Sequence, residues 1–275
     1  MLNLLLAIAS SALVSLTMRF SDGKIRNNIA MLMVNYLLCA GLAWGDTGPT
    51  AAGMGFAAGA GLINGVLYLA GFVLLQQNVR VNGVVLSSTF LKLGLLVSMV
   101  VSVVFFEERP GGLQWMGFAL AVAAIVLMNF RPGEGKAGNA FGLLALLLAG
   151  GGGDAMSKVF EELGNPALSG QFLLITFLTA FGLCGLWILL GKAGKPGKWE
   201  VIFGLLIGIP NFFSAKFLLG ALQDIAAVVV YPVYSVATIL VVTLAGVLIF
   251  REKLEKRQWL ALAMILPALV LLNIG

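Results

Sequence analysis

Hydrophobic residues fill ten long runs of the sequence, and short polar segments separate one run from the next. Each run is close to the roughly 20 residues that a helix needs to cross the hydrocarbon core of a bilayer. A membrane β-strand needs only about ten residues of alternating polarity, so the runs predict helices. The ten predicted spans are 2–18, 28–45, 53–77, 81–106, 113–130, 139–160, 168–190, 200–222, 225–250 and 257–274. None of the connecting segments is long enough to form a separate domain.

The composition indicates that these helices lie in a membrane. Of the 275 residues, 60% are hydrophobic and 11% are charged, whereas about a quarter of an average soluble domain is charged. A soluble fold of this length could not bury so much apolar surface. We therefore predict an all-α polytopic membrane protein with ten transmembrane helices. The first run lacks a preceding basic region and a clear cleavage site, so we expect it to remain as a span.

Basic residues gather in alternate loops. The loops after the first, third, fifth, seventh and ninth spans contain thirteen of them: Arg19, Lys24, Arg26, Arg80, Arg131, Lys136, Lys192, Lys195, Lys198, Arg251, Lys253, Lys256 and Arg257. The other loops contain only Arg109. Because positive loops mark the cytoplasmic side, we expect both termini to lie outside the plasma membrane of a prokaryote. The same distribution explains the net charge of +5, and we expect no nucleic-acid partner.

The sequence also contains an internal repeat. Residues 105–129, FFEERPGGLQWMGFALAVAAIVLMN, align with residues 249–273, IFREKLEKRQWLALAMILPALVLLN, at a constant offset of 144. The aligned polar and aromatic pairs are Glu108 with Glu252, Gln114 with Gln258, Trp115 with Trp259 and Asn129 with Asn273. Five spans is an odd number, so two copies would cross the membrane in opposite senses. We predict two inverted five-helix repeats, 1–131 and 132–275, within one membrane unit. Simple duplication without a transport role is the alternative.

Two five-span halves, each with an acidic turn before a Gln-Trp pair that opens the final helix, resemble the drug/metabolite transporter superfamily. The similarity is greatest to EamA-type transporters and strongest over residues 229–273. It extends over essentially the whole chain and is weakest in the first, second, sixth and seventh spans. The resemblance implies a ten-helix fold and a transport function. It leaves the substrate open, because such relatives handle amino acids, nucleotide sugars, sugar phosphates, drugs and quaternary amines.

Lys92 lies near the middle of the predicted span 81–106. A charge at the centre of a bilayer costs at least about 2.5–3.5 kcal/mol, and the lysine stem is too short to reach water from there. Ser88 and Thr89 lie one turn earlier and form a polar stripe with it. The repeat places Val236 at the equivalent position, so the shared fold does not require a lysine. We expect Lys92 to face a substrate cavity; a structural ion pair is the alternative.

Asp154 is the one acidic residue well inside a predicted span, and it directly follows four glycines, 150–153. Those glycines permit a close approach of backbones. Lys158 lies one turn after Asp154, so the two side chains could neutralise each other. The other hypothesis pairs Asp154 with Lys92 or Lys216 and lets it exchange that partner for substrate or a proton. Asp154 and Lys158 are therefore the candidates for proton coupling.

The remaining candidates for substrate binding lie on three spans. Lys216 follows Phe212 and Phe213 by about one helical turn, so its ammonium shares a helix face with aromatic rings. Asn64 and Tyr68 form a second short polar face on the predicted span 53–77. Two further tyrosines flank Pro232, which removes a backbone hydrogen bond and is tolerated where a helix lines a cavity. These tyrosines are Tyr231 and Tyr234.

These features favour a secondary active transporter that moves a small anionic or zwitterionic metabolite by alternating access. The expected partners are this substrate and the lipid bilayer. Export of drugs or lipophilic cations is an alternative, disfavoured because cations outnumber carboxylates inside the spans. A non-transporting scaffold or regulatory protein is the alternative from another class. The sequence contains no histidine, no nucleotide-binding loop and no nucleophile with a matching base. We therefore expect no enzymatic activity, no cofactor and no metal.

Overall fold

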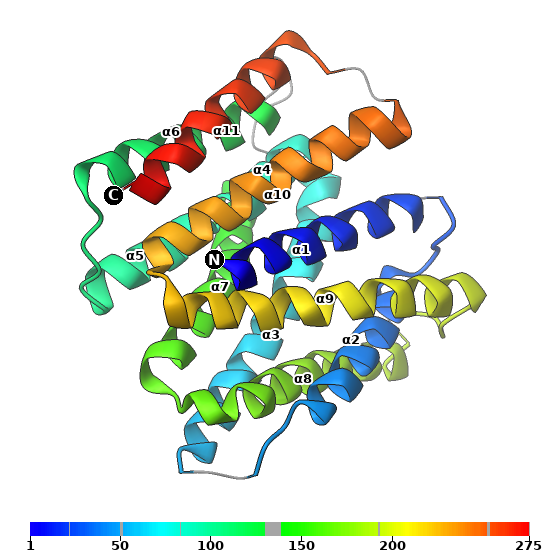
Figure 1. The fold of residues 1–275 in the computed structure, drawn as a ribbon. Coiled ribbons are helices and arrows are strands. Elements are labelled where there is room, and N and C mark those ends of the chain that lie inside the picture. The colour runs from blue at the N-terminus through cyan, green and yellow to red at the C-terminus, as the bar shows by residue number, and fades with distance from the viewer. Residues whose placement is uncertain are drawn as a thin grey trace. The chain divides into compact units, whose positions relative to one another are not determined.

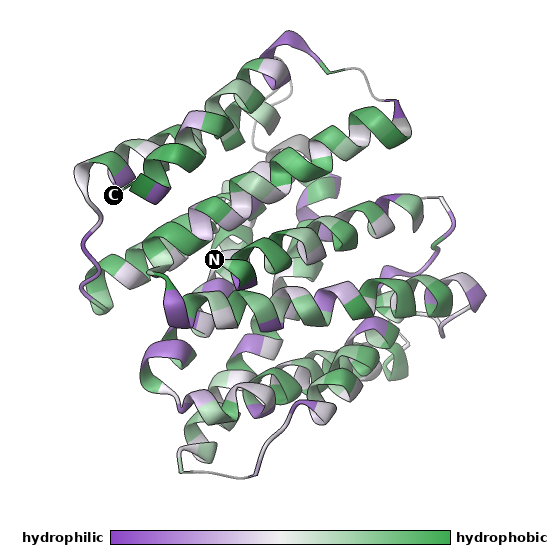
Figure 2. Cartoon of the chain, viewed as in Figure 1, coloured by the Kyte–Doolittle hydropathy of each residue, from purple (hydrophilic) through white to green (hydrophobic). Residues whose placement is uncertain are grey.

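The computed structural model describes residues 1–21, 23–49, 52–82, 84–129, 139–191, 193–251 and 254–274, and these residues contain helices and no strand. The helices are α1 (Leu2–Ser21), α2 (Asn28–Gly45), α3 (Met54–Asn82), α4 (Val84–Lys92), α5 (Leu95–Phe105), α6 (Gly112–Asn129), α7 (Ala140–Leu163), the short 3₁₀ helix η1 (Pro166–Leu168), α8 (Ser169–Leu189), α9 (Lys198–Asp224), α10 (Ala227–Phe250) and α11 (Lys256–Ile274). Figure 2 shows that hydrophobic residues cover most of each helix, while hydrophilic residues concentrate near helix ends.

The prediction of an all-α polytopic membrane protein is confirmed. Within the described residues, nine helical segments are long and apolar enough to cross a membrane, and Gly112–Met128 forms a shorter apolar helix. The structure differs from the sequence prediction in the fourth span. The run 81–106, expected as one helix, is divided into α4 and α5, with Leu93 and Gly94 between them.

The chain forms two compact units, and each unit takes helices from both predicted repeats. Unit 1 comprises Met1–Leu69 and Val159–Gln223, and unit 2 comprises Ala70–Lys158 and Asp224–Gly275. Helices α3 and α7 therefore contribute to both units. The repeat offset of 144 also relates the starts of two helices, because α3 begins at Met54 and α9 begins at Lys198. The opposite membrane senses of the two repeats stay a prediction.

In unit 1, α2 packs along α8 (Figure 1). Buried Met31 of α2 forms a core cluster with Phe203 and Ile207 of α9. A polar contact lies within the same pair of helices, because Asn211 Nδ2 donates to Asn35 Oδ1 at 3.2 Å. Hydrogen bonds of this kind between amide side chains join helices in an apolar environment.

In unit 2, α6 packs along α11, and α10 contacts α5, α6 and α11 (Figure 1). The most extensive packing in this unit is between α6 and α11, which the sequence repeat relates. In unit 1, α2 and α8 are related by the repeat in the same way. Gly117 of α6 permits this closeness, because a Cβ there would lie 3.0 Å from the Cβ of Leu271. Each unit is thus built around packed pairs of related helices.

Candidate functional site

The break between α4 and α5 lies directly beside Lys92, the last residue of α4. Across it the backbone changes to hydrogen bonds of three-residue spacing, from Leu96 N to the Leu93 carbonyl at 2.9 Å and from Val97 N to the Gly94 carbonyl at 2.8 Å. Such tight turns interrupt the regular pattern of an α-helix. A charged side chain and an irregular backbone therefore occur together in the middle of an apolar span.

The glycine run of α7 packs against this break. A Cβ on Gly94 would lie 2.7 Å from the backbone nitrogen of Gly151, and a Cβ on Gly150 would lie 2.7 Å from Leu91 Cδ1. The distance from Gly94 to Gly151 is shorter than real Cβ contacts, so the two backbones approach more closely there than a residue with a side chain permits. The close backbone approach expected from the four glycines is confirmed at Gly151, whereas Gly150 lies against the end of the Leu91 side chain.

Lys92 and Asp154 both lie where α7 crosses the break between α4 and α5, which we call the crossing. Asp154 follows Gly150 by four residues and therefore shares a helix face with it. Both charged side chains are half-buried, and among the residues of unit 2 that the structure describes neither has an ion-pair partner. The ion pair between Asp154 and Lys92 that the sequence suggested is not formed. Charges within an apolar span need water, an opposite charge or a ligand nearby.

Lys158 pairs with Glu108 rather than with Asp154. Its ammonium lies 2.9 Å from Glu108 Oε1, and the two side chains are 3% and 12% exposed. The same ammonium lies 5.8 Å from the centre of the Phe106 ring. The expected i, i+4 neutralisation within α7 is therefore absent, because Lys158 finds a stronger partner in the segment that follows α5.

The Glu108 side chain also caps the N-terminus of α10. Its carboxylate accepts hydrogen bonds from the backbone nitrogens of Ala227 at 3.0 Å and Val228 at 2.9 Å. Such bonds satisfy amides that have no partner within the helix, and a negative charge is favoured at this end of the helix dipole. Glu108 had no predicted role, although its alignment with Glu252 in the sequence repeat was a signal that composition does not explain. Glu108 thus joins α7 to the first turn of α10.

The two tyrosines of α10 lie in different surroundings. Tyr231 is 1% exposed, and its hydroxyl donates to the backbone carbonyl of Asp154 at 2.5 Å. This bond connects α10 to α7 beside the glycine run. Tyr234 is half-buried. Of the stripe predicted beside Lys92, Ser88 is half-buried and Thr89 is buried on α4.

The predicted residues of unit 1 form a second group. Lys216 makes an ion pair with Asp46, directly after α2, and its side chain is 38% exposed. Its ammonium lies 5.9 Å from the centre of the Phe212 ring, as the shared helix face predicts. Asn64 on α3 is fully buried, and both polar atoms of its amide lack a hydrogen-bond partner in the described residues. Tyr68, one turn later, packs edge-on against Phe177 with ring centres 6.3 Å apart.

An unpaired buried amide is costly, by about 1–3 kcal/mol, and is therefore rare in native proteins. Asn64 is consequently the residue of unit 1 whose chemistry is least complete. In unit 2, Lys92 and Asp154 are likewise polar side chains for which the described residues of that unit supply no ion-pair partner. Within the described residues, no group of three or more Asp, Glu or Cys side chains could bind a metal ion.

Comparison with known proteins identifies the family. The sequence model of the EamA-like transporter family matches residues 136–274, which is just over half of the 275 residues. An uncharacterized protein of Haemophilus influenzae is 25% identical over 211 residues, covering 74% of this chain and 72% of that protein. A solved crystal structure superposes with a TM-score of 0.72 over 99% of this chain and 98% of that chain, at 15% identity.

The structural match shows the fold alone, since its sequence identity is low. The family match covers the second predicted repeat and carries the assignment. The chain belongs to the EamA-like transporter family, and the predicted resemblance to drug/metabolite transporters is confirmed. It is a multi-pass membrane protein of a family of transporters.

Proposed function

We propose that this EamA-like transporter is a secondary active transporter of a small polar metabolite that bears a carboxylate or phosphate, including zwitterions such as amino acids. One observation carries the proposal. Lys92 places an ammonium group inside a membrane span, and it has no ion-pair partner among the described residues of unit 2. An anionic substrate would supply the missing opposite charge.

The surroundings of Lys92 support binding rather than a purely structural role. In transporters, interrupted helices commonly contribute to substrate sites near the middle of the membrane, and here Lys92 ends α4 next to the break. Ser88 and Thr89 would extend the polar surface along α4, and Tyr234 would add a hydroxyl or a ring face.

In unit 1, Asn64 and Tyr68 are the proposed polar contacts. Lys216 is the proposed anion contact of unit 1, after exchanging its partner Asp46. Tyr231 would act through the backbone of α7, because its hydroxyl already donates to the Asp154 carbonyl.

Asp154 is the proposed coupling residue. Its carboxylate lies near the same crossing as Lys92 and has no ion-pair partner among the described residues of unit 2. A carboxylate can exchange a proton, so Asp154 could couple a proton gradient to the transport cycle. Lys158 would influence it only indirectly, because Lys158 is paired with Glu108.

Alternating access is supported by two features. The glycine contacts of Gly94 with Gly151 would let α4 and α5 pivot against α7 without displacing side chains. The sequence repeat also supplies related halves, which in inverted form generate two related conformations. The loop charges support a prokaryotic plasma membrane with both termini outside. Modification of single cysteines added at each terminus by an impermeant reagent in intact cells would test that orientation.

A second candidate function is the export of a drug or lipophilic cation. The carboxylate of Asp154 favours this candidate, because it has no ion-pair partner in the described part of unit 2 and could bind a positive charge. A thermal-shift screen of the purified protein against carboxylates, phosphates, amino acids and quaternary amines separates the two. Stabilisation by anions or zwitterions and not by quaternary amines supports the leading proposal, and the reverse pattern supports cation export.

The decisive experiment is uptake by proteoliposomes of the ligands that the screen identifies. Lys92→Met removes the charge with a side chain of similar length, and we expect uptake to fall at least thirtyfold, because truncating one partner of a buried charge pair costs 2 kcal/mol or more. Lys92→Arg should retain part of the activity. Lys256→Met, which changes an exposed lysine at the start of α11, is the matched control.

If Lys92→Met transports every substrate at the rate of the parent, the anion-site proposal is wrong. If the parent protein gives no flux above protein-free liposomes for any ligand, the non-transporting alternative is supported instead. Uptake driven by an imposed pH gradient, and lost in Asp154→Asn, would identify the proton as the coupling ion.

A further inference from the structure

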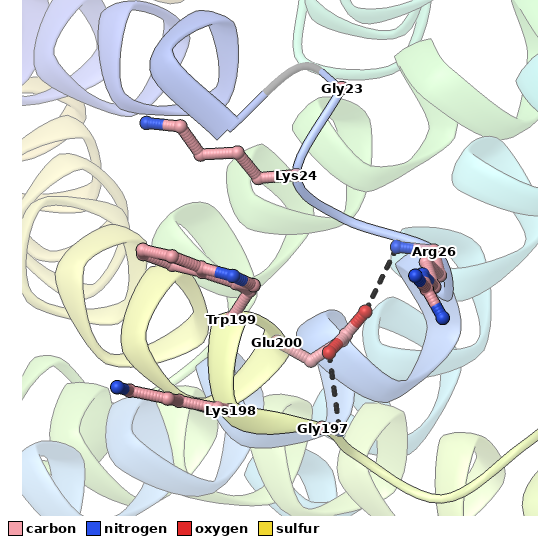
Figure 3. Close-up of a pocket in the computed structure, with 7 residues that line it drawn as sticks. All are labelled: Gly23, Lys24, Arg26, Gly197, Lys198, Trp199 and Glu200. Carbon is pink, nitrogen blue, oxygen red and sulfur yellow. Dashed lines mark hydrogen bonds between the residues drawn. The ribbon is translucent and has the colours of Figure 1, made fainter.

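A separate pocket lies in unit 1, between the segment that joins α1 to α2 and the start of α9. Its volume is about 430 Å³, and its lining includes three cations, Lys24, Arg26 and Lys198, together with Trp199 and Glu200. A cavity of this size can accept a small organic group. Figure 3 shows Lys24 and Lys198 on opposite sides of the Trp199 ring, with Arg26 beyond Glu200.

The one carboxylate of this pocket is already used by backbone groups. Glu200 Oε1 accepts from Arg26 N at 2.9 Å and from Asn27 N at 3.3 Å, and Glu200 Oε2 accepts from Gly197 N at 3.1 Å. These bonds fix the segment after α1 against the start of α9. Asn27 Nδ2 adds a bond to the Gly194 carbonyl at 2.5 Å. The walls of the pocket are therefore connected by hydrogen bonds rather than formed by chance proximity.

The three cations have no acidic ion-pair partner within the part of the chain that the structure describes. Among the described residues, none of Lys24, Arg26 and Lys198 forms an ion pair with Glu200 or with another carboxylate. The Lys24 ammonium lies 5.7 Å from the centre of the Trp199 ring and 5.4 Å from that of the Phe203 ring. Such contacts hold an ammonium in place and leave its N–H groups free to donate. The pocket thus presents three positive charges against one negative charge that faces the backbone.

We propose that this pocket binds a phosphate group, either the phosphodiester of an anionic lipid headgroup or a small soluble phosphate compound. Lysine and arginine are the side chains that bind phosphate oxygens most strongly in proteins. Basic pockets between membrane helices on the positive side bind anionic lipid headgroups. Trp199 is 46% exposed and lies at the end of a span, where tryptophan marks the membrane interface. The site is distinct from the transport site proposed around Lys92.

The test compares two triple variants of the full-length protein. Lys24→Gln/Arg26→Gln/Lys198→Gln removes the cations of the pocket. Arg80→Gln/Lys195→Gln/Lys256→Gln removes the same charge from exposed residues outside it. One arm measures binding of phosphatidylglycerol and phosphatidylcholine to detergent-purified protein by native mass spectrometry. The other arm measures binding of glycerol 3-phosphate and inorganic phosphate by calorimetry. Circular dichroism checks that the helices of both variants are intact.

One cation near a membrane surface contributes about fivefold to the binding of an anionic lipid. We therefore expect the pocket variant to bind phosphatidylglycerol about a hundredfold more weakly than the parent, and the control variant to bind within about threefold of it. Lys24→Gln alone should weaken binding about fivefold. Brominated phosphatidylglycerol should quench the tryptophan fluorescence of the parent more than that of Trp199→Phe.

A pocket-dependent loss of phosphatidylglycerol binding supports the lipid as the source of the phosphate. A pocket-dependent loss confined to glycerol 3-phosphate or inorganic phosphate supports a soluble source. Equal binding by the parent and the pocket variant overturns the proposal, as does an equal loss in the control variant or equal binding of phosphatidylglycerol and phosphatidylcholine.

Discussion

Lys92 and Lys158 both lie in apolar helices of unit 2, and their surroundings differ. Lys158 is buried against Glu108, and Glu108 is in turn bonded to two backbone amides of α10. Lys92 lies at a helix break with no ion-pair partner among the described residues of the unit. The charge of Lys158 is therefore neutralised by a carboxylate of the protein, whereas no carboxylate in the described part of unit 2 pairs with Lys92. The contrast distinguishes a charge that is paired within the fold from one that we propose binds a ligand.

The largest effect on the free energy of unfolding is expected at the ion pair of Lys158 and Glu108. Lys158→Met leaves the Glu108 carboxylate buried without its opposite charge, and breaking a buried pair in this way costs about 3–5 kcal/mol. The free energy of unfolding in detergent, measured by denaturant titration, should fall by that amount. Removing both charges in Lys158→Met/Glu108→Gln should cost less than Lys158→Met alone. A loss below 1 kcal/mol for Lys158→Met would contradict the structural role.

The second effect concerns the crossing that positions Lys92. Gly151→Ala adds a Cβ within 2.8 Å of the Val97 Cβ, and overpacking of this kind costs about 1–3 kcal/mol. The denaturation midpoint should fall, and uptake should fall with it if the crossing moves during transport. Gly182→Ala on α8 is the matched control, because a Cβ there meets nothing within 4 Å. That control should be neutral or stabilising, since alanine is the better helix former.

A smaller effect is expected where α10 bonds to α7. Tyr231→Phe removes the hydrogen bond to the Asp154 carbonyl, and the loss of one such bond costs about 0.5–1.5 kcal/mol. Denaturant titration measures this cost directly. Tyr234→Phe is the comparison on the same helix. If Tyr231→Phe abolishes uptake with unchanged stability, the tyrosine contacts substrate and its structural assignment is wrong.

The smallest effect on stability is expected at Lys92 itself. Because its ammonium contributes to no ion pair in the described residues of unit 2, Lys92→Met should leave the free energy of unfolding within about 0.5 kcal/mol of the parent, or above it. The same variant should lose uptake. A loss of 3 kcal/mol, as expected for Lys158→Met, would show that the two lysines do not differ in kind.

The fold was predictable because bilayer thickness sets the length of every apolar run. Predicted span 225–250 corresponds to α10 at Ala227–Phe250, and predicted span 113–130 corresponds to α6 at Gly112–Asn129. The interruption of the fourth span was not predicted, although the polar residues Ser88, Thr89 and Lys92 lie shortly before Gly94. It arises where the backbone of α7 approaches at Gly151, and such a contact is invisible in a local pattern.

The residues of the candidate site stay predictions, and two of its lysines have ion-pair partners that the sequence did not indicate. Asp154 and Lys158 have the right spacing to interact, but Lys158 binds Glu108, which is 50 positions away in the sequence. Lys216 similarly binds Asp46 at the end of α2. Pairings between distant segments depend on tertiary packing, which helix periodicity does not encode. The aligned glutamates of the repeat were the one sequence signal that marked Glu108.

The packing of related helices has a consequence for biosynthesis. Helices α2 and α6 pack along α8 and α11, which the ribosome makes only after the first half of the chain has been completed. Until then the early helices can enter the bilayer but lack their neighbours, as the two-stage view of membrane insertion allows. We therefore expect the helices of the first half to be loosely associated in the membrane during synthesis. They pack fully only after the second half has been inserted.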